Sequence, residues 1–259
     1  MLDAQEVTGS SPVSPTFSMY TKLKKIAIIN YRAYRESIES LLESGYKVIL
    51  VKPFYGNRSY IASHADLQVF PFYRKVVLAP NLSHFTLRQL VLFLKSSKDI
   101  VIGKSFIREG YPNEVFYNAI IVGKYLVGNL KYLDNVLIDM GKRYGFSLVH
   151  VNQGYVRCTT IPIDANTVIT EDLGIFKKLH SIGINVKFLQ PGFVDIDGYN
   201  YGFLAGGSGI DNNVFYVNGD IDLYPYKREL ENYLKRYRIK IKSLAPGKRP
   251  KDIGSILFI

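Results

Sequence analysis

Apolar and polar positions alternate along the chain with two periods, one typical of buried strands and one typical of amphipathic helices. The opening segment reads as a strand at residues 25–30, a helix at residues 35–44 and a buried strand at residues 47–51. Gly45 is placed to end the helix, because glycine accepts the left-handed backbone that is common there. This order predicts a β-α-β unit and excludes an all-α or all-β protein.

A longer unit of the form β-β-α-β recurs four times after this opening. Its first strands are expected within residues 64–70, 116–121, 157–163 and 206–211. Its helices are expected near residues 86–95, 130–144, 172–181 and 226–237. The repetition predicts an α/β protein built from similar units.

The opening unit is one strand short of this pattern, and the chain ends in an apolar strand at residues 254–259. We expect the C-terminal strand to complete the first unit and to join five units in a ring with pseudo-fivefold symmetry. Such closure would leave no open sheet edge. The alternative is an open mixed α/β sheet in which the similarity of the units is coincidental.

Composition narrows the classes of protein that remain. The 259 residues are 47% hydrophobic and 21% charged, which is enough apolar surface for a globular core. The apolar runs are far shorter than the about 20 residues that span a bilayer, which excludes a transmembrane protein. No Gly-x-Gly-x-x-Gly turn follows the first strand, so a dinucleotide-binding fold is not indicated. A single cysteine, Cys158, excludes an internal disulfide, and the four histidines lack zinc-ligand spacing, so we expect a cytoplasmic protein without a structural metal.

The first 18 residues differ in composition from the rest. They are rich in Ser, Thr, Pro and Gly, and they contain neither a basic residue nor the apolar stretch of a secretory signal. Such a segment cannot offset its ordering entropy by burial. We therefore expect a disordered tail at residues 1–18, with Met19 as the physiological start, and one domain at residues 19–259.

Positive charge is concentrated near the C-terminus. The net charge is +11, and ten Lys and Arg residues stand between Lys227 and Lys251. This region could present a basic face to nucleic acid or to another anionic surface. The alternative is a solvated helix and strand edge that keep the protein soluble.

Two short motifs, together with the repeated units, resemble the guanidino-group-modifying enzymes of the pentein fold. His64-Ala65-Asp66 with the apolar residues after it is similar to the His-x-Asp strand of that superfamily. Gln153-Gly154-Tyr155-Val156-Arg157-Cys158-Thr159-Thr160 is similar to its nucleophile segment. The resemblance implies a five-bladed α/β propeller over residues 25–259 and places the chain in a bacterial branch without a defined substrate.

The resemblance also implies catalytic roles. An amidine carbon is a poor electrophile, so enzymes of this class attack it with a cysteine thiolate and use histidine to protonate the leaving amine. Cys158 would be the nucleophile, His64 the general acid/base, and Asp66 its orienting partner or a carboxylate for the substrate. No metal or organic cofactor would be needed. The alternatives are a packed cysteine and a hydrogen-bonded structural histidine.

Four further residues are candidates for substrate binding. The corresponding place in the last unit holds Gly207 and Ser208 instead of a cysteine, and the glycine would allow close backbone approach. Asn118 stands where the resemblance implies a carboxylate, and its amide can bind an uncharged amide or a carboxylate. Asp211 is the remaining acidic candidate, with a turn residue as its alternative.

Three functions are compatible with these features. The first is a hydrolase or amidinotransferase that acts on a small amidine through a covalent Cys158 intermediate. The second is a non-catalytic pentein that binds RNA, a ribosomal surface or a protein through residues 227–251. The third is a partner-binding remnant whose pocket has lost its activity.

Overall fold

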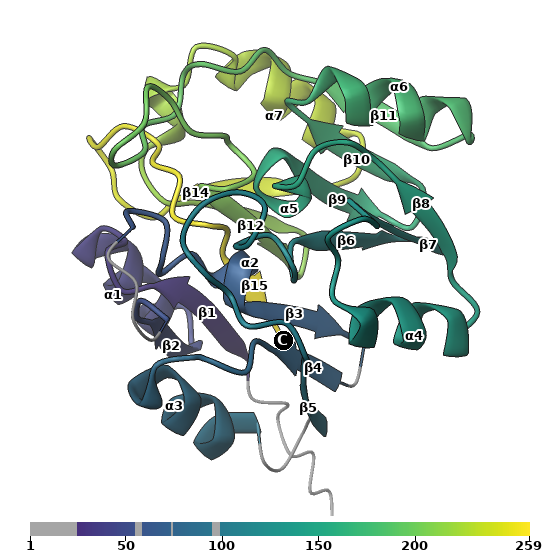
Figure 1. Ribbon diagram of the computed structural model, residues 1–259. Helices are drawn as coiled ribbons and strands as arrows, with labels where there is room; N and C mark the ends of the chain where they lie inside the picture. The colour runs from purple at the N-terminus through teal and green to yellow at the C-terminus, as the bar shows by residue number, and fades with distance from the viewer. Residues whose placement is uncertain (1–24, 55–58, 74, 95–98) are drawn as a thin grey trace, which may run out of the picture.

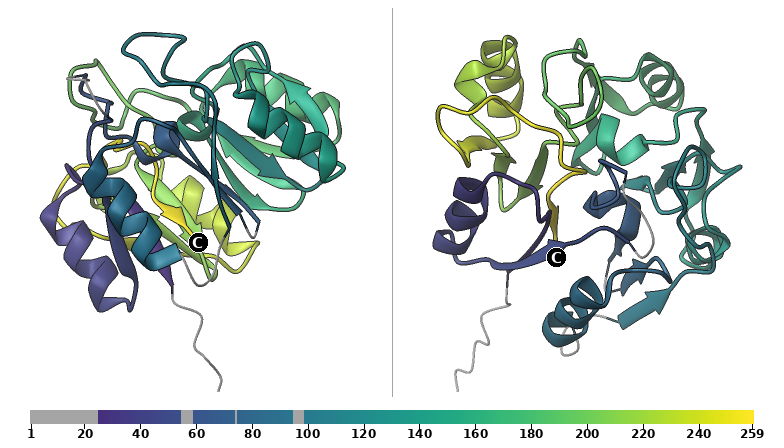
Figure 2. Two further views of the ribbon diagram at one scale, coloured as in Figure 1. Left: turned by 60° about the horizontal axis from the view of Figure 1, so that its bottom comes forward. Right: turned by 60° about the vertical axis from the view of Figure 1, so that its left-hand side comes forward.

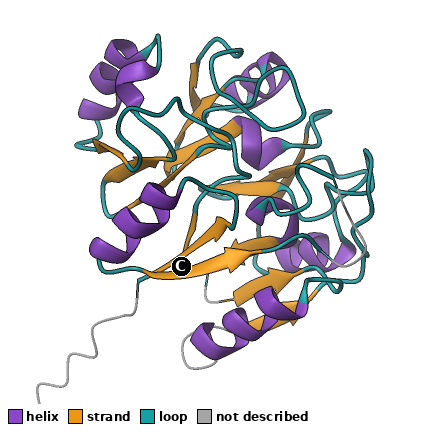
Figure 3. Cartoon of the chain, turned by 90° about the vertical axis from the view of Figure 1, so that its left-hand side faces the viewer, coloured by secondary structure: helices purple, strands orange, loops and turns teal. Residues whose placement is uncertain are grey.

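The computed structural model describes residues 25–54, 59–73, 75–94 and 99–259. The tail expected at residues 1–18 lies outside these ranges. Within them the chain forms five three-stranded sheets, each with one long crossover helix (Figure 1). Figure 3 shows the long helices toward the outside of the molecule and the strands inside them.

The first sheet joins the two ends of the described chain. Its middle strand, β1 (Ile26–Asn30), pairs in parallel with β2 (Lys47–Val51) after the helix α1 (Arg35–Glu43). Its third strand is β15 (Leu257–Phe258), which pairs antiparallel with β1. The right-hand view of Figure 2 shows this yellow strand beside the purple one. The expectation that the C-terminal strand completes the first unit is therefore confirmed.

Each of the other four sheets is one β-β-α-β unit, as predicted. The first and second strands pair antiparallel, and the third pairs in parallel with the second after a helix, as a parallel connection requires. The strands are β3 (Val69–Phe72), β4 (Lys75–Leu78), β5 (Asp99–Ile102), β6 (Ala119–Val122), β7 (Tyr125–Gly128), β8 (Ser147–His150), β9 (Thr160–Asp164), β10 (Thr167–Thr170), β11 (Asn185–Phe188), β12 (Ser208–Asp211), β13 (Val214–Val217) and β14 (Lys240–Ser243). The helices are α3 (His84–Leu94), α4 (Asn135–Arg143), α6 (Leu173–Ser181) and α7 (Lys227–Lys235), and a 3-10 turn spans Ile221–Leu223. We call β3, β6, β9, β12 and β15 the inner strands.

The helices form where apolar residues recur every three or four positions. In α7, Leu230 and Leu234 are fully buried one turn apart, while charged residues occupy most of its other positions. Gly45 ends α1 with a φ of +84°, as expected. The helix expected to begin near Leu130 begins instead at Asn135, because the Asp134 carboxylate caps it by accepting the Val136 N–H at 2.8 Å.

Two short helices stand where the pattern predicted the beginnings of strands. They are α2 (Ala65–Gln68), just before β3, and α5 (Val156–Thr159), just before β9. A short apolar run does not distinguish a buried helical turn from a strand, which explains the error. As a result Asp66 and Cys158 stand on helical turns at the start of an inner strand, and not on the strands themselves.

The apolar core is shared between neighbouring sheets. One cluster joins the first three sheets through residues such as Ile28, Leu78 and Leu126, and another joins the fourth and fifth around Phe215. Inner strand β6 packs beside β9, and β12 packs beside β15. Among the described residues, no helix has the length and apolar character needed to span a membrane.

Candidate active site

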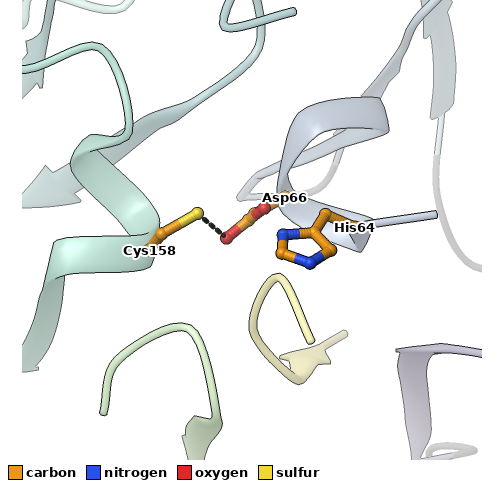
Figure 4. A group of neighbouring side chains, drawn as sticks. All are labelled: His64, Asp66 and Cys158. Atoms are coloured by element: carbon orange, nitrogen blue, oxygen red, sulfur yellow. Dashed lines mark hydrogen bonds between the residues drawn. The ribbon is translucent and has the colours of Figure 1, made fainter. Parts of the chain in front are cut away.

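The three residues predicted to be catalytic lie together. Cys158 belongs to α5, Asp66 belongs to α2, and His64 immediately precedes α2. One ligand atom from each side chain lies within 4.8 Å of the other two, and all three side chains are buried. Figure 4 shows the thiol pointing at the carboxylate, with the imidazole beside it.

Asp66 is the centre of the hydrogen bonds at this site. Its Oδ2 atom accepts from the Cys158 thiol at 3.0 Å and from the Ser255 hydroxyl at 2.8 Å. Its Oδ1 atom is buried and has no hydrogen-bond partner among the described residues. Asp66 is therefore held by the nucleophile candidate and by the C-terminal segment, and it makes no hydrogen bond to His64 in the part of the chain described.

Asn118, predicted to bind substrate, contacts the thiol. Its Nδ2 atom lies 3.5 Å from Cys158 Sγ, and its Oδ1 atom accepts the Arg157 backbone N–H at 2.6 Å. The amide thus links the start of β6 to α5. Through these two contacts Asn118 helps to position Cys158.

Burial controls the protonation of the thiol. Desolvation raises the pKa of Cys158 well above its ordinary value, and the neighbouring Asp66 and Asp252 carboxylates raise it further. Burial likewise raises the pKa of Asp66, against the lowering effect of the hydrogen bonds from Cys158 and Ser255. In this state Cys158 is a protonated thiol that donates to a carboxylate, and the neighbouring Arg157 does not convert it to a thiolate.

His64 is neutral at physiological pH. Desolvation lowers the pKa of its imidazole to about 3, and the side chain is only 4% exposed. No hydrogen bond to its ring is present within the described ranges. A neutral imidazole with an available nitrogen can accept a hydrogen bond or a proton, and burial opposes its protonation.

Cys158 and His64 open into the same pocket, of about 120 Å³. Its walls are mainly apolar and aromatic, and its lining consists of Ile61, His64, Tyr155, Cys158, Ile196, Tyr199, Tyr201, Gly202, Phe203 and Asp252. The Tyr155 hydroxyl is held by the Glu114 carboxylate. No Lys or Arg is among these described lining residues, and Asp252 supplies a carboxyl group.

Asp252 is a site residue that the sequence analysis missed. Its Oδ2 accepts the Phe203 N–H and its Oδ1 accepts the Gly254 N–H, both at 3.0 Å. Burial raises the pKa of this carboxyl to about 7. In the sequence Asp252 was only one acid within a basic segment. Its position just before the last inner strand, where the other units carry their candidates, was the signal that could have identified it.

Comparison with protein-family models assigns the chain to a family. A family model described as "Family of unknown function (DUF6873)" matches residues 28–257. The chain belongs to this family. Among curated proteins, a sequence search gave no match.

Solved structures show that this DUF6873 member has the pentein fold. It superposes on C. jejuni agmatine deiminase with a TM-score of 0.54 and 11% identity, covering 86% of this chain and 88% of that one. For DDAH from Pseudomonas aeruginosa with citrulline the TM-score is 0.54 at 11% identity, covering 86% and 92%. For the inosamine-phosphate amidinotransferase of Streptomyces griseus it is 0.50 at 11%, covering 86% and 78%. The five three-stranded sheets of this chain match the pentein fold that the resemblance to guanidino-modifying enzymes predicted.

Gly207 and Ser208 support the site without lining the pocket. A Cβ at Gly207 would lie 2.8 Å from the Lys251 carbonyl oxygen, so the glycine allows the segment before Asp252 to pass close by. Ser208 is fully buried, and its backbone oxygen accepts the Ile256 N–H. Both residues hold the C-terminal segment in place, which is the close backbone approach expected of Gly207.

Asp211 is not part of the pocket in this DUF6873 member. It stands at the far end of β12, where the strand turns back into β13, and its Oδ2 accepts from the Tyr46 hydroxyl at 2.6 Å. Asp211 is the last residue of β12, and each strand residue advances the chain by about 3.3 Å. It therefore lies well away from the beginning of that strand. The prediction that Asp211 binds substrate finds no support in this placement.

The basic C-terminal region contains many ion pairs. Lys227 pairs with Asp222 at 2.7 Å, and Lys248 pairs with Glu36 at 2.8 Å. Arg249 and Lys251 also face carboxylates, those of Asp195 and Asp197. These pairs reduce the positive charge presented between Lys227 and Lys251, so we do not propose nucleic-acid binding there.

The same three side chains also form a set that could bind a metal ion. The Cys158 thiol, the His64 imidazole and the Asp66 carboxylate are donors that zinc accepts. Metal binding would require the Cys158 thiol to lose the proton that it now donates in a hydrogen bond to Asp66. A chelator therefore belongs in every assay of the thiol.

Proposed function

We propose that this protein is a cysteine-dependent enzyme that acts on a C–N bond of a small amidine or guanidine, as a hydrolase or an amidinotransferase. The observation that carries the proposal is the meeting of Cys158, His64 and Asp66 beside one pocket that also contains the Asp252 carboxylate. The named solved structures, which include a deiminase and an amidinotransferase, support the class.

Binding begins with the cationic group of the substrate. Asp252 lies at the pocket wall with a carboxyl pKa of about 7, and an incoming amidinium would favour its ionised form. Tyr199 and Tyr201 offer aromatic faces to the rest of the substrate. Because the described lining has no cationic side chain, we propose a substrate without a carboxylate.

The first half-reaction uses the hydrogen bond between Cys158 and Asp66. As Sγ attacks the amidinium carbon, the thiol proton passes to the Asp66 carboxylate 3.0 Å away. The resulting carboxylic acid returns that proton to the leaving nitrogen, the C–N bond breaks and an amine departs. Cys158 is left joined to the substrate carbon as a thiouronium, the thiol proton has left with the amine, and Asp66 is again a carboxylate.

The second half-reaction uses the neutral imidazole. His64 takes a proton from water, or from an acceptor amine in a transferase, as that nucleophile attacks the thiouronium carbon. The C–S bond then breaks and the sulfur takes the proton held by His64. A new amidine leaves as its cation, whereas a urea leaves after releasing the remaining proton to water. Burial lowers the pKa of His64, so the imidazole is neutral when this step begins.

The test is alkylation of Cys158, which is the single cysteine of the chain. Chloroacetamidine and uncharged iodoacetamide are compared in the presence of EDTA, with Cys158→Ser as blank. We expect saturable labelling by the amidine reagent and protection by benzamidine. Slow labelling by both reagents without saturation would overturn the proposal. Asn166→Cys in the Cys158→Ser background supplies an exposed thiol on the β9–β10 turn as the control for intrinsic reactivity.

We also propose that the five sheets close into a five-bladed propeller within a single domain at residues 19–259. Its support is a cavity of about 190 Å³ whose lining includes residues from every inner strand. The pairing of β15 with β1 supports it as well. An experimental structure in which β15 lies apart from β1 would contradict this closure.

A further inference from the structure

The cavity between the inner strands is separate from the pocket at Cys158. The two hollows have no lining residue in common. Half-buried residues of all five inner strands line the cavity: Pro71, Ile121, Pro162, Ile210 and Phe258. The first four are each the third residue of their strand, so equivalent positions of the repeated units form an apolar wall.

The two short helices α2 and α5 each contribute one charged residue to the cavity lining. Asp66 and Arg157 are each the second residue of their helix, α2 and α5, and they are the only charged residues among the described lining. Asp66 is 1% exposed, and its Oδ2 atom is bonded to Cys158 and Ser255. Arg157 is only half-buried, so of the two charged groups its guanidinium is the more accessible to a ligand.

The Arg157 guanidinium has unused donors. Its backbone N–H is bonded to Asn118, but its side chain makes no hydrogen bond or ion pair within the described ranges. Burial lowers the pKa of Arg157, and the charges of the nearby Asp66 and Cys158 oppose this shift. A planar oxyanion would satisfy the fork of N–H groups in pairs.

We propose that this cavity binds a small monocarboxylate with a short apolar tail. The carboxylate would accept hydrogen bonds from the Arg157 guanidinium, and the tail would lie along the apolar wall toward Ile210 and Phe258. The cavity volume of about 190 Å³ far exceeds the about 10–15 Å³ that one water occupies by the same measure, so a chain of several carbons fits. The site does not depend on the chemistry proposed for Cys158.

Hexanoate is the probe, with hexan-1-ol and hexylamine as tail-matched controls. Binding is measured by calorimetry and by ligand-observed NMR on the full chain. We expect saturable binding of hexanoate alone. Loss of a charge-assisted pair in Arg157→Gln should weaken it by at least about tenfold. Hexan-1-ol that binds as tightly as hexanoate would overturn the proposal, as would an Arg157→Gln protein with unchanged affinity.

A second pair of variants keeps the test decisive if Arg157→Gln fails to fold. Ile210→Trp fills the apolar end of the cavity and leaves Arg157 in place, and it should abolish hexanoate binding. Leu92→Trp adds the same ring on α3 at a position that is 71% exposed, and it should bind normally. Equal binding by both variants would overturn the proposal. Cys158→Ser should keep full affinity, and loss of binding there would assign hexanoate to the other pocket and overturn the proposal too.

Discussion

The Cys158 thiol donates a hydrogen bond to Asp66 Oδ2 at 3.0 Å, although 92 positions separate the two residues in the chain. The bond joins α5 to α2, two units apart, and the same oxygen is bonded to Ser255 from the C-terminal segment. Three distant segments therefore meet at one carboxylate. The protonation of the nucleophile candidate depends on that carboxylate.

Replacing Asp66 with asparagine should make the thiol more acidic. The Asp66 carboxylate raises the pKa of Cys158 both by its charge and by its hydrogen bond, so removing the charge lowers that pKa. Iodoacetamide should label Asp66→Asn about tenfold faster at neutral pH, given the strength of a charge-assisted hydrogen bond. Turnover of a substrate should nevertheless fall by at least about a hundredfold, since the proton acceptor is lost. Ser255→Ala is the matched control, with a smaller effect on labelling, and slower labelling of Asp66→Asn would contradict the assignment.

Cation binding should follow the ionisation of Asp252. Because burial raises the pKa of this carboxyl to about 7, the ionised form becomes dominant only above that pH. The affinity for benzamidine should therefore rise through neutral pH and be about tenfold lower one unit below the pKa. His64, with a pKa of about 3, does not titrate in this range. Calorimetry on the wild type and Asp252→Asn checks this, and a flat wild-type profile would refute the role of Asp252.

Glu171 should make stability depend on pH. Burial raises the pKa of its carboxyl to about 8, and its Oε2 accepts the Leu204 N–H at 2.5 Å. Between the unfolded value near 4.5 and pH 8 the folded protein binds more protons, so the free energy of unfolding falls as pH rises. Glu171→Gln lacks this loss and should gain stability relative to wild type between pH 5 and pH 8. Urea unfolding of both proteins at pH 5 and pH 8 measures the gain in the free energy of unfolding. The same difference between variant and wild type at both pH values would contradict the role of Glu171.

Gly254 should be needed to seat His64. Its φ is +74°, and a Cβ there would overlap the backbone and side chain of His64. Gly45 has a similar φ of +84° but open space around it, which makes Gly45→Ala the matched control. Left-handed strain alone costs about 1–2 kcal/mol, so Gly254→Ala should destabilise by more than Gly45→Ala and also reduce turnover. Thermal unfolding and activity of both variants test this, and equal losses would exclude the contact with His64.

The periodicity of apolar positions was sufficient to predict the repeated units of the architecture. Helix and strand alternation, Gly45 at the end of α1 and the apolar C-terminal strand predicted β-β-α-β units and the pairing of β15 with β1. The repeated units depend on residues near each other in the chain. The pairing of β15 follows because an apolar strand needs a hydrogen-bonded neighbour. The errors came at residues 64–68 and 156–159, where a single buried helical turn has the same apolar pattern as a strand.

The chemistry of the site was decided by tertiary structure. The sequence supplied Cys158, His64 and Asp66 as candidates, because residue type and local motif are written in the chain itself. Only packing could show that Asp66 bonds to Cys158, that Asp252 enters the pocket and that Asp211 does not. Burial and contacts across tens of residues set these relationships, and they change the pKa values on which the proposed reaction depends. The sequence alone thus determined the repeated units and the reactive groups, and the fold decided which groups meet and in which protonation state.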